Sequence, residues 1–128
     1  MYQYRVTCVR FIDGDTFIGD IDLGFDLSLK NQHCRLDGID APEKNTEAGQ
    51  RALEYAKKWV ANVEDSHREL YVTVKAKNDK YGRRLVVLYG CETGLSLNLL
   101  LRDENMAVAY DGRSKRGVTN VERKEDQP

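Results

Sequence analysis

The clearest structural signal in the sequence is the stretch YQYRVTCVRF, which covers residues 2–11. Apolar and polar residues alternate from Tyr2 to Cys8, as in a β-strand with one buried face. At Cys8 and Val9 the apolar phase shifts by one residue, and the pattern then continues to Phe11. A phase shift inside a strand indicates a β-bulge, which bends a sheet towards a closed barrel.

Further period-2 patterns follow this first strand. Apolar residues occupy odd positions over residues 17–29, which predicts one long strand, or two strands that turn near Gly24. The same reasoning predicts additional strands at residues 34–39, 70–77 and 84–89, with a turn at 78–82 and a last extended piece at 107–110.

The spacing of apolar residues changes from two to three and four after residue 46. Thr46 is a good N-cap, and the apolar pattern from Ala52 to Val63 predicts a helix over residues 46–63, with a second helix over about 96–104. This order of elements is not a βαβ repeat. It indicates an α+β fold, mainly β, in which a five-stranded OB-type barrel carries two to three packed helices.

Length and composition place the chain among globular proteins. It has 128 residues, of which 41% are hydrophobic and 32% are charged, and this length suits one domain. No stretch of 18 apolar residues is present, so no membrane span is expected. We expect one domain over residues 1–112 and a flexible C-terminal tail over 113–128, where the apolar pattern is lost.

Cysteine usage and charge give weaker indications. Cys8, Cys34 and Cys91 are odd in number and far apart, which argues against a disulfide framework. The first residues already have a strand pattern and leave no room for a signal peptide, so we expect a cytoplasmic protein, and a monomer. The formal net charge of −1 predicts no partner by itself.

Two acidic clusters, at residues 13–16 (DGDT) and 37–43 (DGIDAPE), lie where strands are expected to end. Carboxylates that converge from strand ends can bind a hard cation. Asp-Gly is also a common turn pair, so either cluster alone is equally consistent with a simple turn. His33 and His67 are isolated, and no cysteine pair has ligand spacing, so a zinc site is not expected.

A third cluster, DKYGRR, covers residues 79–84. It is consistent with a solvated hairpin turn or with an anion site, because arginine binds phosphate oxygens in a two-pronged manner. Arg35, on the polar side of its strand, could supply a second guanidinium. OB-type barrels often bind oligonucleotides through stacked aromatic rings, and Tyr81 and Tyr110 are candidates for that role.

Together these clusters make the chain resemble the staphylococcal nuclease (thermonuclease-like) family. The matching stretches are IDGDT at 12–16, Arg35-Leu36 followed by DAPE at 40–43, and DKYGR at 79–83. The resemblance implies an OB barrel with helices and a Ca²⁺-dependent phosphodiesterase that cuts DNA and RNA, with single-stranded or frayed strands as substrate.

The same resemblance implies a role for each matched residue. Asp15 and Asp40 correspond to the metal-binding aspartates, and Ala41 to the residue that offers a backbone carbonyl to the ion. Glu43 corresponds to the glutamate that orients or deprotonates the attacking water. The remaining matches are Arg35 and Arg83, which grip the scissile phosphate, and Lys80, Tyr81 and Tyr110, which hold the nucleotide.

An alternative from a different class is a catalytically silent OB module that binds nucleic acid or a protein. A Ca²⁺-binding structural domain is a third possibility, but it leaves Arg83 and Tyr81 unexplained. The pI near 6.1 is low for a nucleic-acid-binding protein, so affinity is expected to depend on the metal and on local positive charge.

Overall fold

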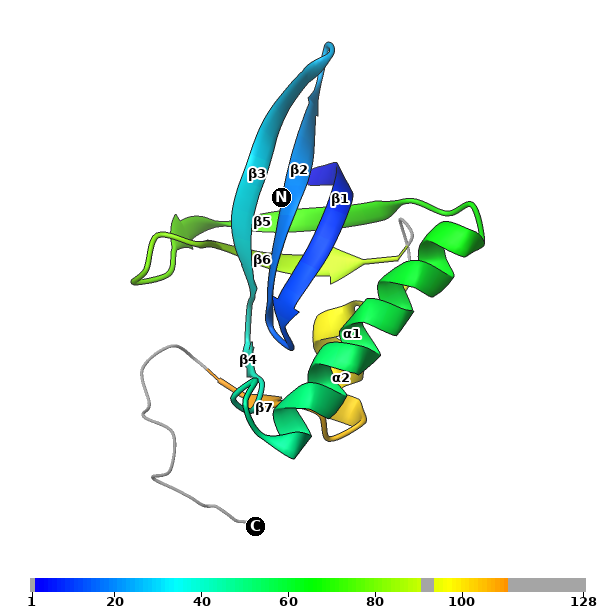
Figure 1. The fold of residues 1–128 in the computed structure, drawn as a ribbon. Coiled ribbons are helices and arrows are strands. Elements are labelled where there is room, and N and C mark those ends of the chain that lie inside the picture. The colour runs from blue at the N-terminus through cyan, green and yellow to red at the C-terminus, as the bar shows by residue number, and fades with distance from the viewer. Residues whose placement is uncertain (1, 91–93, 111–128) are drawn as a thin grey trace.

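The computed structural model describes residues 2–90 and 94–110. Within them the elements are, in order, β1 (Gln3–Asp13), β2 (Thr16–Gly24), β3 (Leu27–Leu36), β4 (Ile39–Asp40), α1 (Glu47–Asp65), β5 (Leu70–Asn78), β6 (Arg84–Tyr89), α2 (Leu97–Asp103) and β7 (Val108–Ala109). Five strands form a closed barrel in the order β1-β2-β3-β6-β5, and the two helices pack on its outside (Figure 1). The mainly β, OB-type α+β fold expected from the sequence is confirmed.

The first strand bends where the sequence indicated. Its pairing with β2 skips Cys8 and Val9, and Cys8 adopts a positive φ of 55°. Before this bulge β1 also pairs with β5, from Gln3 opposite Thr73 onwards. The bend therefore lets one strand pair with both neighbours and close the barrel.

The pattern over residues 17–29 belongs to two strands. β2 and β3 turn at Phe25 and Asp26, next to Gly24. The prediction of a separate strand at 34–39 is wrong. Residues 34–36 are the end of β3, and the chain then turns at Gly38, whose φ is +82°. Ile39 and Asp40 form the short strand β4 beyond that turn.

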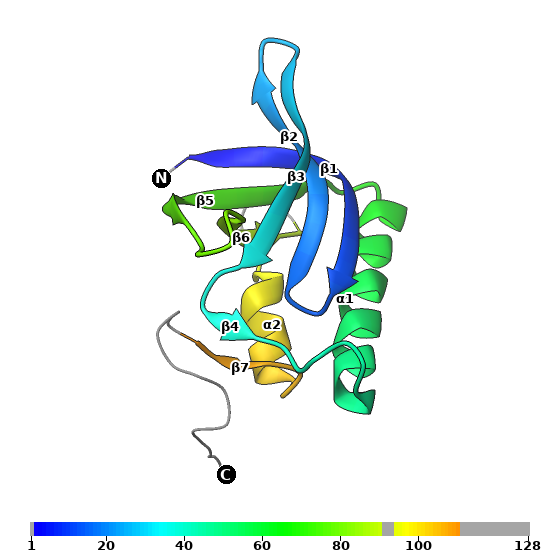
Figure 2. The same ribbon diagram turned by 60° about the vertical axis from the view of Figure 1, so that its left-hand side comes forward.

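The outer half of the β2–β3 hairpin has no buried face, although its alternating pattern is typical of a half-buried strand. Figure 2 shows this hairpin extending well beyond the barrel. Phe25 at its tip is 97% exposed, and Leu23 and Leu27 are also exposed. Alternation predicts a strand here but does not show where the barrel ends.

The helix after residue 46 is confirmed, and it runs from Glu47 to Asp65. The Thr46 hydroxyl accepts a hydrogen bond from the Gly49 N–H, as an N-cap does. One face of α1 is buried against the core, which also contains fully buried side chains of β2, β3, β6 and α2; the largest are Phe17, Leu36, Leu88, Leu97 and Leu101.

The two short strands bring the C-terminal part of the described chain beside the end of β3. β4 pairs with β7, and the Tyr110 N–H donates to the Gly38 carbonyl oxygen at 2.9 Å. The flexible tail expected at 113–128 lies outside the described residues. None of the described helices is long and apolar enough to cross a membrane.

Both described cysteines, Cys8 and Cys34, have free thiols. Cys91 lies outside the described residues.

Candidate functional site

A cleft of about 790 Å³ opens where the β1–β2 turn, the end of β3, the segment between β4 and α1, and the β5–β6 turn meet. Its volume is within the range of about 300–1,000 Å³ that is usual for ligand sites. The nine site residues that the sequence indicated all line it: Asp15, Arg35, Asp40, Ala41, Glu43, Lys80, Tyr81, Arg83 and Tyr110. Folding therefore brings together three motifs that are far apart in the sequence.

Two carboxylates share one guanidinium group in this cleft. Arg35 Nη2 lies 3.1 Å from Asp40 Oδ1 and 3.4 Å from Asp15 Oδ2. The Ala41 N–H also donates to Asp15 Oδ2 at 2.8 Å, which ties the segment after β4 to the β1–β2 turn. Asp15 and Asp40 thus face the same small volume, although they lie in different parts of the chain.

Arg35 itself is more deeply buried than the sequence suggested. It was expected on the polar side of its strand, but only 8% of its surface is exposed. Its Nη1 donates to the carbonyl oxygens of Leu36 and Ile39, both at 2.8 Å. The guanidinium is therefore fixed by backbone contacts on one side and by carboxylates on the other.

Asp13 belongs to the same cluster, and the sequence reasoning gave it no role. Burial, together with a hydrogen bond to the Asp15 carboxyl, raises the pKa of Asp13 to about 6. Burial also opposes ionisation of Asp15, but hydrogen bonds from Asp13 and the Ala41 N–H, and the charge of Arg35, bring the pKa of Asp15 below its ordinary value. The sequence signal for this interaction was a pair of aspartates, two residues apart, in a tight turn.

Arg83 is held by the turn that carries it. Its Nε donates to Asp79 Oδ2 at 2.7 Å, its Nη2 lies 2.6 Å from the same oxygen, and its Nη1 donates to Thr16 Oγ1 at 3.3 Å. The other Asp79 oxygen accepts from the backbone N–H groups of Tyr81 and Arg83. Asp79 is thus a positioning residue that the sequence reasoning missed, although an aspartate at the start of a tight turn was a usable signal.

Two tyrosines are placed beside the arginines. Tyr81 is 72% exposed, and the centre of its ring lies 5.2 Å from Arg83 Cζ and 5.4 Å from Lys80 Nζ. The Tyr110 ring lies 5.5 Å from Arg35 Cζ. All three contacts are within the range of cation–π attraction, which favours an ordered aromatic surface at the rim of the cleft.

Glu43 lies at the rim of the cleft and is exposed, while its backbone is fixed. Its carbonyl oxygen accepts from the Thr46 N–H at 3.0 Å and from the Thr46 hydroxyl at 2.7 Å. Gly49 lies so close that a Cβ at this position would overlap the same carbonyl oxygen. The N-terminus of α1 therefore determines where Glu43 stands.

Replacement of Gly49 with alanine tests this packing. Alanine usually stabilises a helix relative to glycine by about 0.5–1 kcal/mol. Here we expect the free energy of unfolding to fall instead, by about 1–3 kcal/mol, because the new methyl group must displace the Glu43 backbone. Urea unfolding measures the change, and Ala61→Gly at an exposed position of α1 gives the propensity difference as a reference. A more stable Gly49→Ala variant would contradict the close packing.

The residues of the cleft fit a hard divalent cation. Arg35 Nη2 already lies between the Asp15 and Asp40 carboxylates, so this position accepts positive charge. Carboxylate and carbonyl oxygens are the ligands that Ca²⁺ prefers. Within residues 2–90 and 94–110, no three His, Cys, Asp or Glu side chains are grouped so as to hold a metal ion by themselves.

The barrel and the cleft define the class of protein: an OB-type domain in which several carboxylates and two guanidinium groups line one cavity. A family model described as staphylococcal nuclease homologue matches residues 33–127, which is most of the chain, and the chain therefore belongs to this family. A comparison with curated proteins gives no match. The matched range contains Arg35, Glu43 and Arg83, whereas Asp15 lies before it.

Proposed function

We propose that this protein is a Ca²⁺-dependent nuclease that hydrolyses phosphodiester bonds of DNA, RNA or both by attack of water on phosphorus. The observation that carries the proposal is the meeting of Asp15, Asp40, Arg35 and Arg83 in one cleft, with Glu43 at its rim. Membership of a nuclease-like family supports the same reaction class.

Asp15, Asp40 and the backbone carbonyl of Ala41 would hold the Ca²⁺ ion. When bound, the ion supplies positive charge beside the phosphate and the attacking water. Ca²⁺ accepts irregular shells of oxygen ligands, so water and phosphate oxygens can complete a site with few protein ligands.

The two arginines stabilise the charge that develops on the phosphate oxygens. A phosphodiester is already anionic, and the attack of water increases the charge on its equatorial oxygens. Guanidinium groups held in advance, as Arg83 is by Asp79, stabilise that charge without reorganisation during the reaction. Glu43 orients or deprotonates the attacking water.

The aromatic and basic rim holds the nucleotide. Tyr81 and Tyr110 present aromatic rings beside the cleft, and Lys80 provides a positive charge. Such rings stack on unpaired bases, which favours single-stranded or frayed substrate. The protein is proposed to act as a monomer in the cytoplasm.

The metal requirement is the first test of the proposal. Purified protein incubated with denatured DNA is expected to hydrolyse it with Ca²⁺ and to do so only slightly with Mg²⁺ alone, because Mg²⁺ demands a near-ideal octahedral shell. Gel analysis of the products measures the reaction. Full activity in excess EGTA, with Mg²⁺ as the only divalent ion, would contradict the metal assignment. Binding of DNA without any cleavage would favour the silent module instead.

A further inference from the structure

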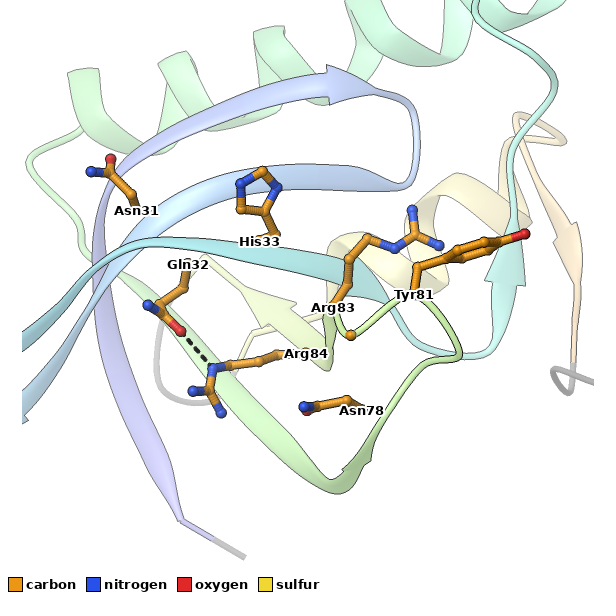
Figure 3. A pocket seen from close by; sticks show the side chains of 8 residues that line it. Asn31, Gln32, His33, Asn78, Tyr81, Arg83 and Arg84 are labelled. Carbon is orange, nitrogen blue, oxygen red and sulfur yellow. Dashed lines mark hydrogen bonds between the residues drawn. The ribbon is translucent and has the colours of Figure 1, made fainter.

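A second groove, of about 550 Å³, adjoins the cleft. It lies between β3 and the β5–β6 turn and is lined by Asn31, Gln32, His33, Asn78, Tyr81, Gly82, Arg83 and Arg84. Asn78, Tyr81 and Arg83 line the cleft as well, so the two cavities meet at these side chains. Figure 3 shows Arg83 and Tyr81 on one side of the groove and Gln32, paired with Arg84, on the other.

The charge of this groove differs from that of the cleft. Its described lining includes two arginines and no aspartate or glutamate, whereas carboxylates dominate the cleft. Asp79 already pairs with Arg83, which leaves Arg84 as the main uncompensated charge beside the groove. Side-chain amides and an imidazole supply further hydrogen-bonding groups. A lining of this composition suits an anion.

Arg84 is oriented towards such a ligand. Its Nε donates to Gln32 Oε1 at 2.8 Å, which fixes the plane of the guanidinium group. Among the described residues, this is the only hydrogen bond of the Arg84 side chain, and no ion pair of Arg84 with them is found. A guanidinium with one side fixed and two terminal nitrogens available binds a phosphate group in a two-pronged manner.

The position of the groove in the fold favours a nucleic-acid strand as the source of that phosphate. OB-type barrels bind oligonucleotides on the second and third strands and through the loop between the fourth and fifth. In this chain these parts are β2, β3 and the β5–β6 turn, and the groove lies between β3 and that turn. The ladder between β3 and β6 begins only at Cys34 and Arg84, so the preceding residues of β3 have no partner in β6.

We propose that the second groove binds the backbone phosphate of a nucleotide next to the one that is cleaved, with Arg84 as its main contact. The strand then passes over Tyr81 from the cleft into the groove. This inference rests on the proposed nuclease function and adds to it a preference for polynucleotides over the shortest substrates.

The test compares the binding of short and long strands to a variant that is expected to cleave them much more slowly than the wild type. In a Glu43→Gln background with Ca²⁺, fluorescence anisotropy measures the binding of a labelled dinucleotide and of a longer oligothymidylate. Arg84→Gln is expected to weaken binding of the long strand roughly tenfold, the usual worth of a hydrogen bond to a charged group. It should also reduce the slope of log K against log salt by about 0.7, as expected for one lost phosphate contact on a single strand. The dinucleotide should be affected much less.

Two further variants serve as controls. Arg68 is exposed just before β5, at the opposite end of that strand from the β5–β6 turn, and Arg68→Gln removes the same charge. It is expected to leave the dependence on strand length unchanged. Arg84→Lys keeps the charge but loses the fork, so it should retain most of the salt slope while losing part of the affinity.

The outcomes separate the inference from the function on which it rests. If the Glu43→Gln chain binds neither oligonucleotide, the proposed function fails and the inference fails with it. If it binds both, and Arg84→Gln changes neither affinity or changes both equally, only the inference is overturned. An effect of Arg84→Gln on competition by inorganic phosphate, without any dependence on strand length, would indicate a free-anion site and would also overturn it.

Discussion

Replacement of Glu43 with glutamine is expected to lower kcat by about 10²–10⁴-fold, which is the usual contribution of a general base. Glutamine keeps the shape of the side chain and one acceptor oxygen, but it removes the base and its negative charge. Phosphate binding depends on Arg35, Arg83 and the cation, so affinity for a short single-stranded oligonucleotide should hold or rise slightly. Single-turnover cleavage with Ca²⁺ measures the first quantity, and fluorescence anisotropy measures the second.

A matched control for this variant lies four residues away. Glu47 is in the first turn of α1 and its side chain is 93% exposed. Its ion pair with Arg51 is an exposed one of the kind that contributes little to stability. Glu47→Gln should therefore cleave at the wild-type rate. Equal rates for both variants would show that Glu43 is not the base.

The barrel could be predicted because its key features are local in the sequence. The bulge at Cys8 and Val9 appears as a change of apolar phase, and the start of α1 appears as an N-cap at Thr46. Each signal depends on neighbouring residues alone, and the structure confirms both. Closure of the barrel then follows from a curved first strand with several short strands after it.

The length of the β2–β3 hairpin beyond the barrel could not be predicted in the same way. Ile21 is buried and Leu23 is exposed, yet both stand at alternating apolar positions of one strand. Their burial depends on whether other strands lie beside them. The pairing of β1 with β2 ends at Val6 and Ile21. The position of this end depends on β1, which is a separate segment of the chain, and so it does not follow from the residues of the hairpin.

The candidate site, like the barrel, has features that the sequence predicted and features that it did not. The sequence motifs indicated which residues meet, because the strands of a barrel bring their ends together. They did not indicate that Arg35 is buried. In its buried position Arg35 donates a hydrogen bond to the carbonyl oxygen of Ile39, which lies beyond the turn at Gly38. From the sequence alone, Arg35 and Arg83 were equivalent candidates for binding phosphate. In the structure they differ, because Arg35 is buried against backbone carbonyls and Arg83 is held by Asp79.

The substitutions Arg83→Lys and Arg35→Lys are accordingly expected to differ. Each should lower kcat by about 10²–10³-fold, the usual cost of removing one preorganised donor to a developing oxyanion, because an ammonium cannot replace a two-pronged contact. Arg83 is partly exposed and held by Asp79, so its substitution should leave overall stability nearly unchanged. Arg35 bridges two backbone carbonyls and two carboxylates. A lysine cannot reach all four, and each buried acceptor without a donor costs roughly 1–3 kcal/mol.

Urea unfolding and single-turnover cleavage, measured on the same preparations, separate these effects. Arg35→Lys should lower both the free energy of unfolding and kcat, whereas Arg83→Lys should lower kcat alone. Arg68→Lys, at an exposed position before β5, controls for the exchange of an arginine for a lysine. Near-normal turnover in both site variants would show that these arginines act only as bulk charge. Unchanged stability in Arg35→Lys would show that its contacts with the backbone carbonyls do not hold the end of β3 in place, because their loss would then have no measurable cost.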